Sequence, residues 1–310
     1  MTMKTTRRDF LKLTLAGAAG YMLAPRELRA FLQEQQQTPG TFGVARASDP
    51  AEAVRTAVDL IGGMGRFVPK GSVVFVKPNI SWDKVPEQAA TTNPLVVETV
   101  VRMVREAGAK KVIVADNACN DARRTYVRSG IKEAAERAGA EVPFMEPRKF
   151  VKMDIGGTVI QDWEVYRDAV DADLIINLPI AKHHGLSEVT LGMKNMMGLI
   201  GGRRDLLHQN LPDGVVDLTA FFKPKLTILD AVRLLKKNGP QGSTLKDVVD
   251  LGTVAASADP VAIDAFGVTL FGDALPSTDY RAFPHIVEAA SRGLGSPEFK
   301  GAGYREVDLG

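Results

Sequence analysis

Cysteine is almost absent from this chain of 310 residues, which contains only Cys119. A single cysteine excludes an intramolecular disulfide, an iron–sulfur cluster held by cysteines alone, and a c-type haem attached through Cys-x-x-Cys-His. Cys119 lies between Asn117 and Asn120, and we interpret it as a small residue in a tight strand-to-helix loop in preference to a reactive thiol. The cofactor is therefore unknown, and a metal ion held by other side chains stays open.

Long apolar runs are also scarce. Residues 13–24 form an apolar run that is rich in Ala and Gly. This run is shorter than the roughly 20 apolar residues that a membrane-spanning helix needs. No second run is long enough, so the sequence predicts no stable transmembrane span after the first 30 residues.

Three common functional motifs are missing. The chain has no Walker phosphate loop, no Gly-x-Gly-x-x-Gly dinucleotide fingerprint and no Gly-x-Ser-x-Gly nucleophile elbow. The glycine-rich residues 62–65 follow a helical pattern instead of preceding one. These absences remove the usual signatures of nucleotide binding and of α/β-hydrolase chemistry.

The amino terminus does carry a recognisable signal. Arg7 and Arg8 are followed by Asp9 and then by Phe-Leu-Lys, directly before the apolar run. This order is typical of a bacterial twin-arginine export signal, whereas an ordinary basic amphipathic segment would not need Phe-Leu-Lys at those offsets. The expected partner is the twin-arginine translocase, and the expected location is the periplasm or another extracytoplasmic space. Because this route carries folded proteins, a ligand can be bound before export.

We expect three segments along the chain. Residues 1–30 are the signal peptide, residues 31–41 are a Gln-rich linker, and residues 42–310 form a single large α/β domain. Removing residues 1–30 leaves 33 basic and 35 acidic residues out of 39 and 37, so the net charge changes from +2 to about −2. The basic isoelectric point is thus partly a property of the signal, and no nucleic-acid partner is predicted.

The central chain alternates between strand and helix patterns. Short apolar runs suit buried parallel strands, and Asn or Asp followed by Pro suits helix starts. A five-residue motif at residues 105–109 returns at residues 136–140, which fits consecutive helix–strand units with right-handed crossovers. Strands are expected at 73–76, 111–115, 141–145, 174–177 and 226–229, and helices at 50–61, 94–108, 124–138 and 260–271. The predicted fold is α/β, a mostly parallel sheet flanked by helices, in one domain or two closely joined lobes.

Polar residues follow several of the predicted strands. Lys77 and Asn79 come after the first strand, Asp116 after the second, Lys182 with His184 after a later one, and Asp230 after the strand at 226–229. Turns favour Asn, Asp and Pro for structural reasons alone, so a single case says little. Ligands of open α/β sheets gather beyond the carboxyl ends of strands, so together these residues indicate a cleft.

Residues 182–202 are the least ordinary stretch of the chain. Lys194 and Asn195 stand there among Leu, Met and Ile residues. A lysine in such a setting either binds an anion or extends its ammonium group to solvent, and both interpretations stay open. The methionines are expected to pack in the core and not to bind a soft metal. His183 and His184 diverge if they lie in a strand, so only one of them can serve as a metal ligand or general base.

Two further carboxylates precede or lie within the helix expected at 260–271. Asp259 is explained as a helix cap. Asp264 stands among apolar residues of the helix and is the stronger functional candidate.

The chain resembles the domain of unknown function 362 (DUF362) family from about residue 42 to residue 272. The motifs that carry the resemblance are Phe75-Val76-Lys77-Pro78-Asn79, Thr92-Asn93-Pro94, residues 106–112, residues 182–198, Leu229-Asp230-Ala231, residues 238–240 and residues 259–265. The family pattern Lys-x-His-Gly maps onto Lys182, His184 and Gly185. The clustered cysteines of the iron–sulfur members are missing, so no electron-transfer role is implied. The family has no settled activity, and the resemblance therefore sharpens the site more than the function.

Two functional hypotheses follow. In the first, an exported protein binds a metal or an anionic small molecule, or both, and acts as an enzyme. The catalytic candidates are His184, Lys194 and Asp264, with Asp264 or Asp230 as the partner of His184. The ligand-binding candidates are Lys77, Asn79, Asn93, Asp116, Lys182, Asn195 and Asp230. In the second, the protein is a non-catalytic cofactor carrier or assembly factor of the cell envelope.

Overall fold

A computed structural model describes residues 41–301 and 303–310. The predicted export signal, and the predicted linker up to residue 40, lie outside this range. All described residues belong to one compact unit, Gly40–Gly310, and its first strand, β1, begins at Phe42. Among the described helices, none has both the length and the apolar character needed to cross a membrane.

One large sheet organises the unit. Its strands follow the order β11-β1-β10-β9-β6-β2-β3, and β7 and β8 extend it beside β9. The strands are β1 (Phe42–Arg46), β2 (Val73–Pro78), β3 (Lys111–Val114), β6 (Leu174–Leu178), β7 (Ile180–His184), β8 (Glu188–Thr190), β9 (Leu226–Leu235), β10 (Val248–Ser257) and β11 (Tyr304–Asp308). Five of the eight strand pairings are parallel. The predicted α/β fold with a mostly parallel sheet is confirmed. A separate antiparallel pair is formed by β4 (Phe150–Asp154) and β5 (Asp162–Tyr166).

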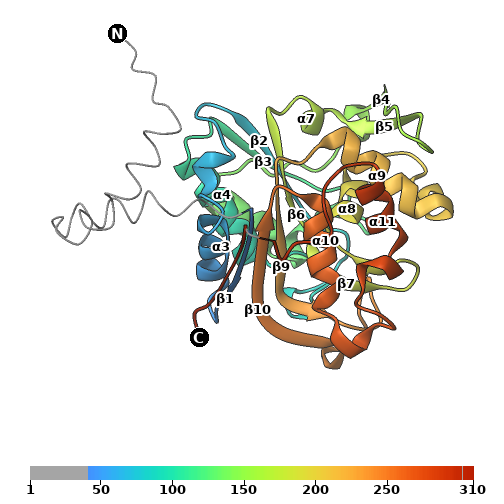
Figure 1. Ribbon diagram of the computed structural model, residues 1–310. Coiled ribbons are helices and arrows are strands. Elements are labelled where there is room, and N and C mark those ends of the chain that lie inside the picture. Colours follow the sequence, from blue (N-terminus) through green and yellow to red (C-terminus); the bar gives the residue numbers. More distant parts are fainter. Residues whose placement is uncertain (1–40, 302) are drawn as a thin grey trace, which may run out of the picture. The chain divides into compact units, whose positions relative to one another are not determined.

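Helices cover both faces of the large sheet (Figure 1). One group is α3 (Pro50–Asp59), α4 (Pro94–Glu106), α5 (Ala122–Arg128) and α6 (Ile131–Arg137). The other group is α8 (Gly192–Asn195), α9 (Leu211–Phe222), α10 (Pro260–Thr269) and α11 (Pro284–Ser291), with the short α7 (Arg167–Val170) beside β5. Alternation along β2 serves both layers, because Val74 and Val76 join one buried core and Phe75 joins the other.

The helix starts follow the local sequence. Asp49, Asn93 and Asp259 each accept a hydrogen bond from a free backbone amide at the start of α3, α4 and α10. Proline follows each of them, where its fixed φ suits the first turn. Between β2 and β3, α4 forms the crossover of a parallel pair, as the sequence predicts.

Three details of the prediction are wrong. The helix expected at 124–138 is two helices, because Gly130 adopts a φ of 72° between α5 and α6. The strand expected at 141–145 is reduced to a single bridge from Glu141 to Ile113, since Pro143 lacks the amide that would continue the ladder. Strand β9 continues to Leu235, so Asp230 lies inside the strand and not at its end.

Candidate functional site

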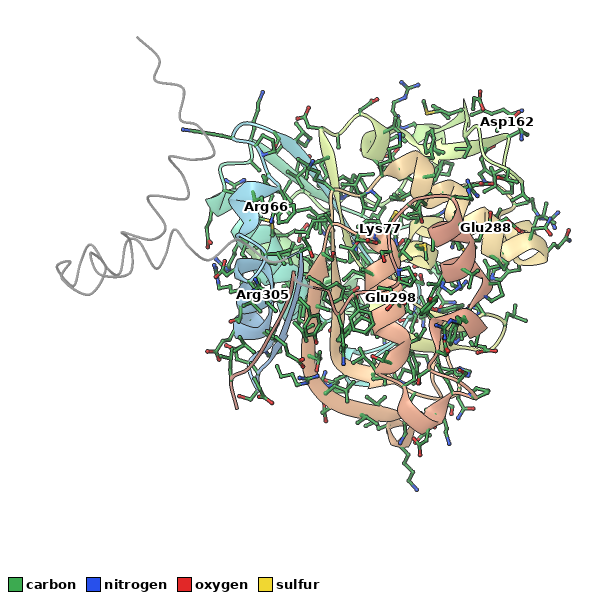
Figure 2. The ribbon with its side chains drawn as sticks, in the orientation of Figure 1. Arg66, Lys77, Asp162, Glu288, Glu298 and Arg305 are labelled. Atoms are coloured by element: carbon green, nitrogen blue, oxygen red, sulfur yellow. The ribbon has the colours of Figure 1, made fainter. Side chains whose placement is uncertain are left out.

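Lys77 is fully buried near the carboxyl end of β2, with an exposure of 1%. Its ammonium group lies 2.7 Å from Oδ1 of Asp116 and donates to Oδ1 of Asn195 at 2.9 Å and to the carbonyl of Pro78 at 2.9 Å. Burial lowers the pKa of Lys77, although Asp116 opposes this effect. In Figure 2, Lys77 lies in the middle of the ribbon, whereas Asp162 lies at the periphery. The ion pair with Asp116 thus holds the ammonium group of Lys77 in place inside the fold.

Asn195 joins three elements of the site. Its carboxamide nitrogen donates to the carbonyl of Lys77 at 3.1 Å and to Oδ1 of Asn177 at 2.9 Å. Asn177 lies in β6 and donates in turn to the carbonyl of Gly192, the first residue of α8. Short helix α8 is therefore tied to the ends of β2 and β6, which places Lys194 beside them.

Lys182 enters the site from β7. Its ammonium group donates to Oδ1 of Asn79 at 3.0 Å and to the carbonyl of Ala90. Asn79 uses its own amide nitrogen to donate to Oδ1 of Asn195 at 3.1 Å. Both hydrogen-bond partners of Lys182 are neutral, and in the described chain its ammonium group forms no ion pair, although the charge of Asp116 acts on it from farther away.

Asp264 has a different place from the one expected. Its two carboxylate oxygens accept the backbone amides of Gly192 at 2.6 Å and Met193 at 3.1 Å. Nε2 of His285 is 3.6 Å from Oδ2. Asp264 is completely buried and caps the start of α8 from α10. In the described chain no hydrogen bond or ion pair joins Asp264 to His184, and Asp264 holds the backbone of the segment that carries Lys194.

Asp230 and Asn93 also serve the fold. Asp230 accepts the backbone amides of Asn93 at 2.7 Å and Val232 at 3.0 Å. Burial raises the pKa of Asp230 to about 6. Asn93 caps α4. In the described chain no hydrogen bond or ion pair joins Asp230 to His184, and neither Asp230 nor Asn93 lines the cleft around Lys77, Lys182 and His184.

A cleft of about 430 Å³ opens over Lys77, Asn79, Lys182 and Asn195. We call it the cationic cleft, because its basic lining residues are Lys77, Lys182, Lys194, Arg204, His184 and His208. One carboxylate, Asp205, stands on the lining, and it is paired with Arg203 at 3.0 Å. Asp116 lies behind Lys77 and is not part of the lining. The side chains facing the cleft therefore carry an excess of positive charge.

Two lysines of the cleft have no acidic partner in the described part of the chain. Lys182 has only the neutral hydrogen-bond partners given above, and the ammonium group of Lys194 has a single polar contact, to the sulfur of Met197 at 3.7 Å. Burial lowers the pKa of Lys182 to about 7 and that of Lys194 to about 8. Thr190 adds a buried hydroxyl on the cleft wall that has no hydrogen-bond partner among the described residues. The cleft thus offers donors that the described protein does not satisfy.

His184 lies on the cleft wall as a neutral imidazole. Its Nδ1 accepts the backbone amides of Leu186 at 3.1 Å and Ser187 at 3.3 Å, so the proton is assigned to Nε2. Burial, and next the charge of Lys194, lower the pKa of His184 to about 3. In this tautomer Nε2 is a hydrogen-bond donor. The adjacent His183 diverges, as the sequence predicts, and its Nδ1 accepts the amide of Gly239 at 3.1 Å.

Arg204 and His208 are cleft residues that the sequence did not reveal. Both come from the 3₁₀ segment Arg204–Asn210. Arg204 donates to the carbonyls of Asn117 and Ala118, and its guanidinium lies 3.3 Å from the sulfur of Cys119. The ring of His208 stacks on His184 at 6.0 Å between centroids. The available sequence signal was the basic pair Arg203-Arg204, which directly follows the glycine-rich end of residues 182–202.

Metal ligands are not grouped in the described residues. Within them, no cluster of three or more His, Cys, Asp or Glu side chains is arranged to hold an ion. Cys119 is a free thiol on the exposed rim, in the loop between β3 and α5 where the sequence predicts it.

Comparison with known proteins gives one family match. The sequence profile of a domain of unknown function, DUF362, matches residues 74–269. A thylakoid-associated protein of Synechocystis sp. is 30% identical over 226 residues, which cover 68% of this chain and 67% of that protein.

Among solved structures, the lactate racemase apoprotein from Thermoanaerobacterium thermosaccharolyticum is similar with a TM-score of 0.44 and 11% identity. The similarity covers 74% of this chain and 57% of that chain. A Thermotoga maritima protein has a TM-score of 0.33 and 13% identity, over 58% of this chain and 49% of the other. This chain thus spans about half the length of these two structures, and the likeness is too low to transfer a function.

Proposed function

The chain belongs to the DUF362 family, and we propose that its cationic cleft binds a small anionic molecule. Lys194 and Lys182 supply the positive charge, and Asn79, Thr190 and His184 supply neutral donors or orientation. Lys77 and Asn195, which were expected to bind the ligand, hydrogen-bond to each other and form the rigid bottom of the cleft on which the ligand rests. Asp116 compensates Lys77, so that the charge of Lys182 and Lys194 remains for the ligand.

The observation that carries this proposal is that Lys182 and Lys194 form no ion pair with a carboxylate among the residues that the structure describes. A buried ammonium group that faces only neutral dipoles is costly, and an incoming carboxylate or phosphate group removes that cost. A carboxylate or phosphate group bound there also meets a wall with a single carboxylate, which is already paired with Arg203. The charge of the lining therefore favours an anion over a cation or a neutral sugar.

The same lysines suit proton transfer. Lys182 has a pKa of about 7, so it exchanges its proton at neutral pH more readily than an ordinary lysine. His184 is held as a neutral donor and is better placed to orient the ligand than to accept a proton. We therefore propose Lys182 and Lys194 as the acid–base groups of any reaction in the cleft, with His184 beside them.

We further propose that the protein acts outside the cytoplasm. The twin-arginine pattern at Arg7 and Arg8 supports export of the folded chain. The related Synechocystis protein is described as associated with thylakoids, and a place at or near a membrane fits both observations.

The binding test uses Lys194→Met. Sulfate binding, followed by isothermal titration, is expected to fall at least about tenfold, because one charge-assisted contact is worth about 1.5–3 kcal/mol. The thermal midpoint should change little, since the ammonium group of Lys194 has only one polar contact in the described chain, to the sulfur of Met197. His184→Ala should also weaken binding.

Lys225→Met is the matched control, because this lysine is exposed and remote from the cleft lining. Equal sulfate binding by the native protein and Lys194→Met would contradict the proposal. Mass spectrometry and elemental analysis of the natively exported protein would then identify what it carries, and a bound ligand without turnover would favour the carrier hypothesis.

A further inference from the structure

A second hollow of about 420 Å³ lies beside the cationic cleft. Its wall includes the apolar residues Val189, Leu211, Pro212, Val215, Phe283 and Pro284, after which we call it the apolar hollow, and also the polar residues Ser187, Glu188 and Gln209. The apolar residues come from β8, from α9 and from the start of α11. Of these elements, β8 also contributes Thr190 to the cleft, whereas α9 and α11 line only the hollow.

The two spaces adjoin. Leu186, Lys194 and His208 line both of them. Lys194 thus borders both spaces, and a molecule that contacts its ammonium group lies directly beside the hollow. Leu186 is a large apolar side chain with 76% exposure, and it adds apolar surface at the junction.

Charge distinguishes the two spaces. The cationic cleft carries six basic side chains, whereas the hollow adds only His285 as a further basic group and Glu188 as a carboxylate. His285 faces Asp264 across 3.6 Å. A second anionic group in the hollow would meet Glu188 and no unpaired cation beyond the shared wall. The hollow therefore favours an uncharged, apolar part of a ligand.

We propose that the ligand of the cationic cleft is amphipathic, with an acidic head at Lys194 and an apolar chain or ring in the apolar hollow. This inference rests on the proposed function and adds the class of molecule: an organic acid or phosphate monoester with a hydrocarbon portion. Each methylene that enters the hollow should tighten binding about fourfold until the hollow is filled.

The first test compares methyl phosphate with hexyl phosphate by isothermal titration on the native protein. We expect hexyl phosphate to bind at least about tenfold tighter. Hexyltrimethylammonium, which has the same chain and the opposite charge, should not bind. Acetate and hexanoate repeat the comparison with a carboxylate head and show which acid the cleft prefers.

The second test fills the hollow. Ala282 is exposed and lines the apolar hollow but not the cationic cleft. Ala282→Trp should reduce the affinity for hexyl phosphate to that for methyl phosphate and leave methyl phosphate binding unchanged. Val287→Trp is the matched control, because Val287 is 42% exposed on α11 and lines neither space.

The outcomes separate the two proposals. Equal binding of methyl and hexyl phosphate, both weakened by Lys194→Met, would overturn the amphipathic ligand and leave the anion site standing. A chain-length effect that survives Ala282→Trp, or equal binding of hexyltrimethylammonium, would also overturn it. Failure of every acid to bind the native protein would refute the anion site itself.

Discussion

Lys77 and Asn195 hydrogen-bond to each other in both directions. The ammonium group of Lys77 donates to Oδ1 of Asn195 at 2.9 Å, and the amide of Asn195 donates to the carbonyl of Lys77 at 3.1 Å. The two residues are 118 positions apart in the sequence. One bond fixes a side chain of β2 and the other fixes its backbone, so α8 cannot shift without disturbing both. Lys77 and Asn195, which we call the floor of the cleft, are thus held in place by contacts that also hold α8 against β2.

Gly198→Ala should collapse this floor. A Cβ at position 198 would lie 1.8 Å from Oδ1 of Asp116 and 2.5 Å from Nζ of Lys77, which forces the ion pair apart. Breaking a buried pair costs about 3–5 kcal/mol, and chemical denaturation measures that loss.

Gly65→Ala provides the control for this substitution, because nothing lies within 4 Å of its added Cβ. The control should retain the stability of the native protein. Equal stability of the two variants would mean that the pair at Lys77 tolerates a large displacement.

Asp264→Ala should destabilise the protein and weaken ligand binding together. Two buried amides, those of Gly192 and Met193, would lose their acceptor, at about 1–3 kcal/mol for each group. Unfolding by urea measures the first effect, and sulfate titration the second. Asp250→Ala, with 85% side-chain exposure, should be nearly silent. Weaker sulfate binding with unchanged stability would instead support a direct role of Asp264 in the site, as first expected.

Anion affinity should fall as the pH rises through the neutral range. An anion binds the protonated lysines, and the pKa values of Lys182 and Lys194 in the free protein are about 7 and about 8. Below these values both groups are charged and binding is strongest. Above them, each proton that must be taken up weakens binding by about tenfold per pH unit.

Sulfate suits this measurement because its own charge is constant across the neutral range. A bound anion raises the pKa of both lysines, so the decline in affinity begins at their pKa values in the free protein and levels off above their higher pKa values in the complex. In Lys194→Met the affinity should decline through the titration of Lys182 alone, and so less steeply than in the native protein. A flat profile from the acidic to the basic side of neutral would rule out these lysines as the anion ligands.

Replacing Arg7 and Arg8 by lysine should retain the protein in the cytoplasm. The translocase distinguishes the guanidinium pair from other cations, so charge alone does not rescue the signal. Cell fractionation of the host that makes the chain measures the result. The Lys4→Arg variant, which leaves the pair intact, is the control, and normal export of the double lysine variant would overturn the localisation.

Local sequence was sufficient where the determining contacts are local. The helix starts at Pro50 and Pro94 were predicted from an Asn or Asp before the proline, because the amides that Asp49 and Asn93 accept lie within the next few residues. Lys77 and Lys182 were predicted to share a cleft, because the ends of neighbouring strands in a parallel sheet meet at one edge. Both arguments need only the order of elements along the chain.

The remaining site depends on contacts between distant residues. Asp264 was expected to work with His184, yet its partner Gly192 is 72 positions away and is reached through its backbone amide. A carboxylate in an apolar helix looks the same in sequence whether it meets a ligand or a helix start. His208 entered the cleft because its segment folds back onto β7, where the ring stacks on His184.

Strand β11 closes one side of the large sheet by pairing in parallel with β1, where Phe42 lies opposite Tyr304 and Arg46 opposite Asp308. Arg46 also forms an ion pair with Glu306, 260 positions away. A chain cut short before Tyr304 would leave the outer backbone groups of β1 unpaired. Exposed strand edges recruit other strands, so such truncated chains should self-associate and precipitate even though every residue of the cleft is present.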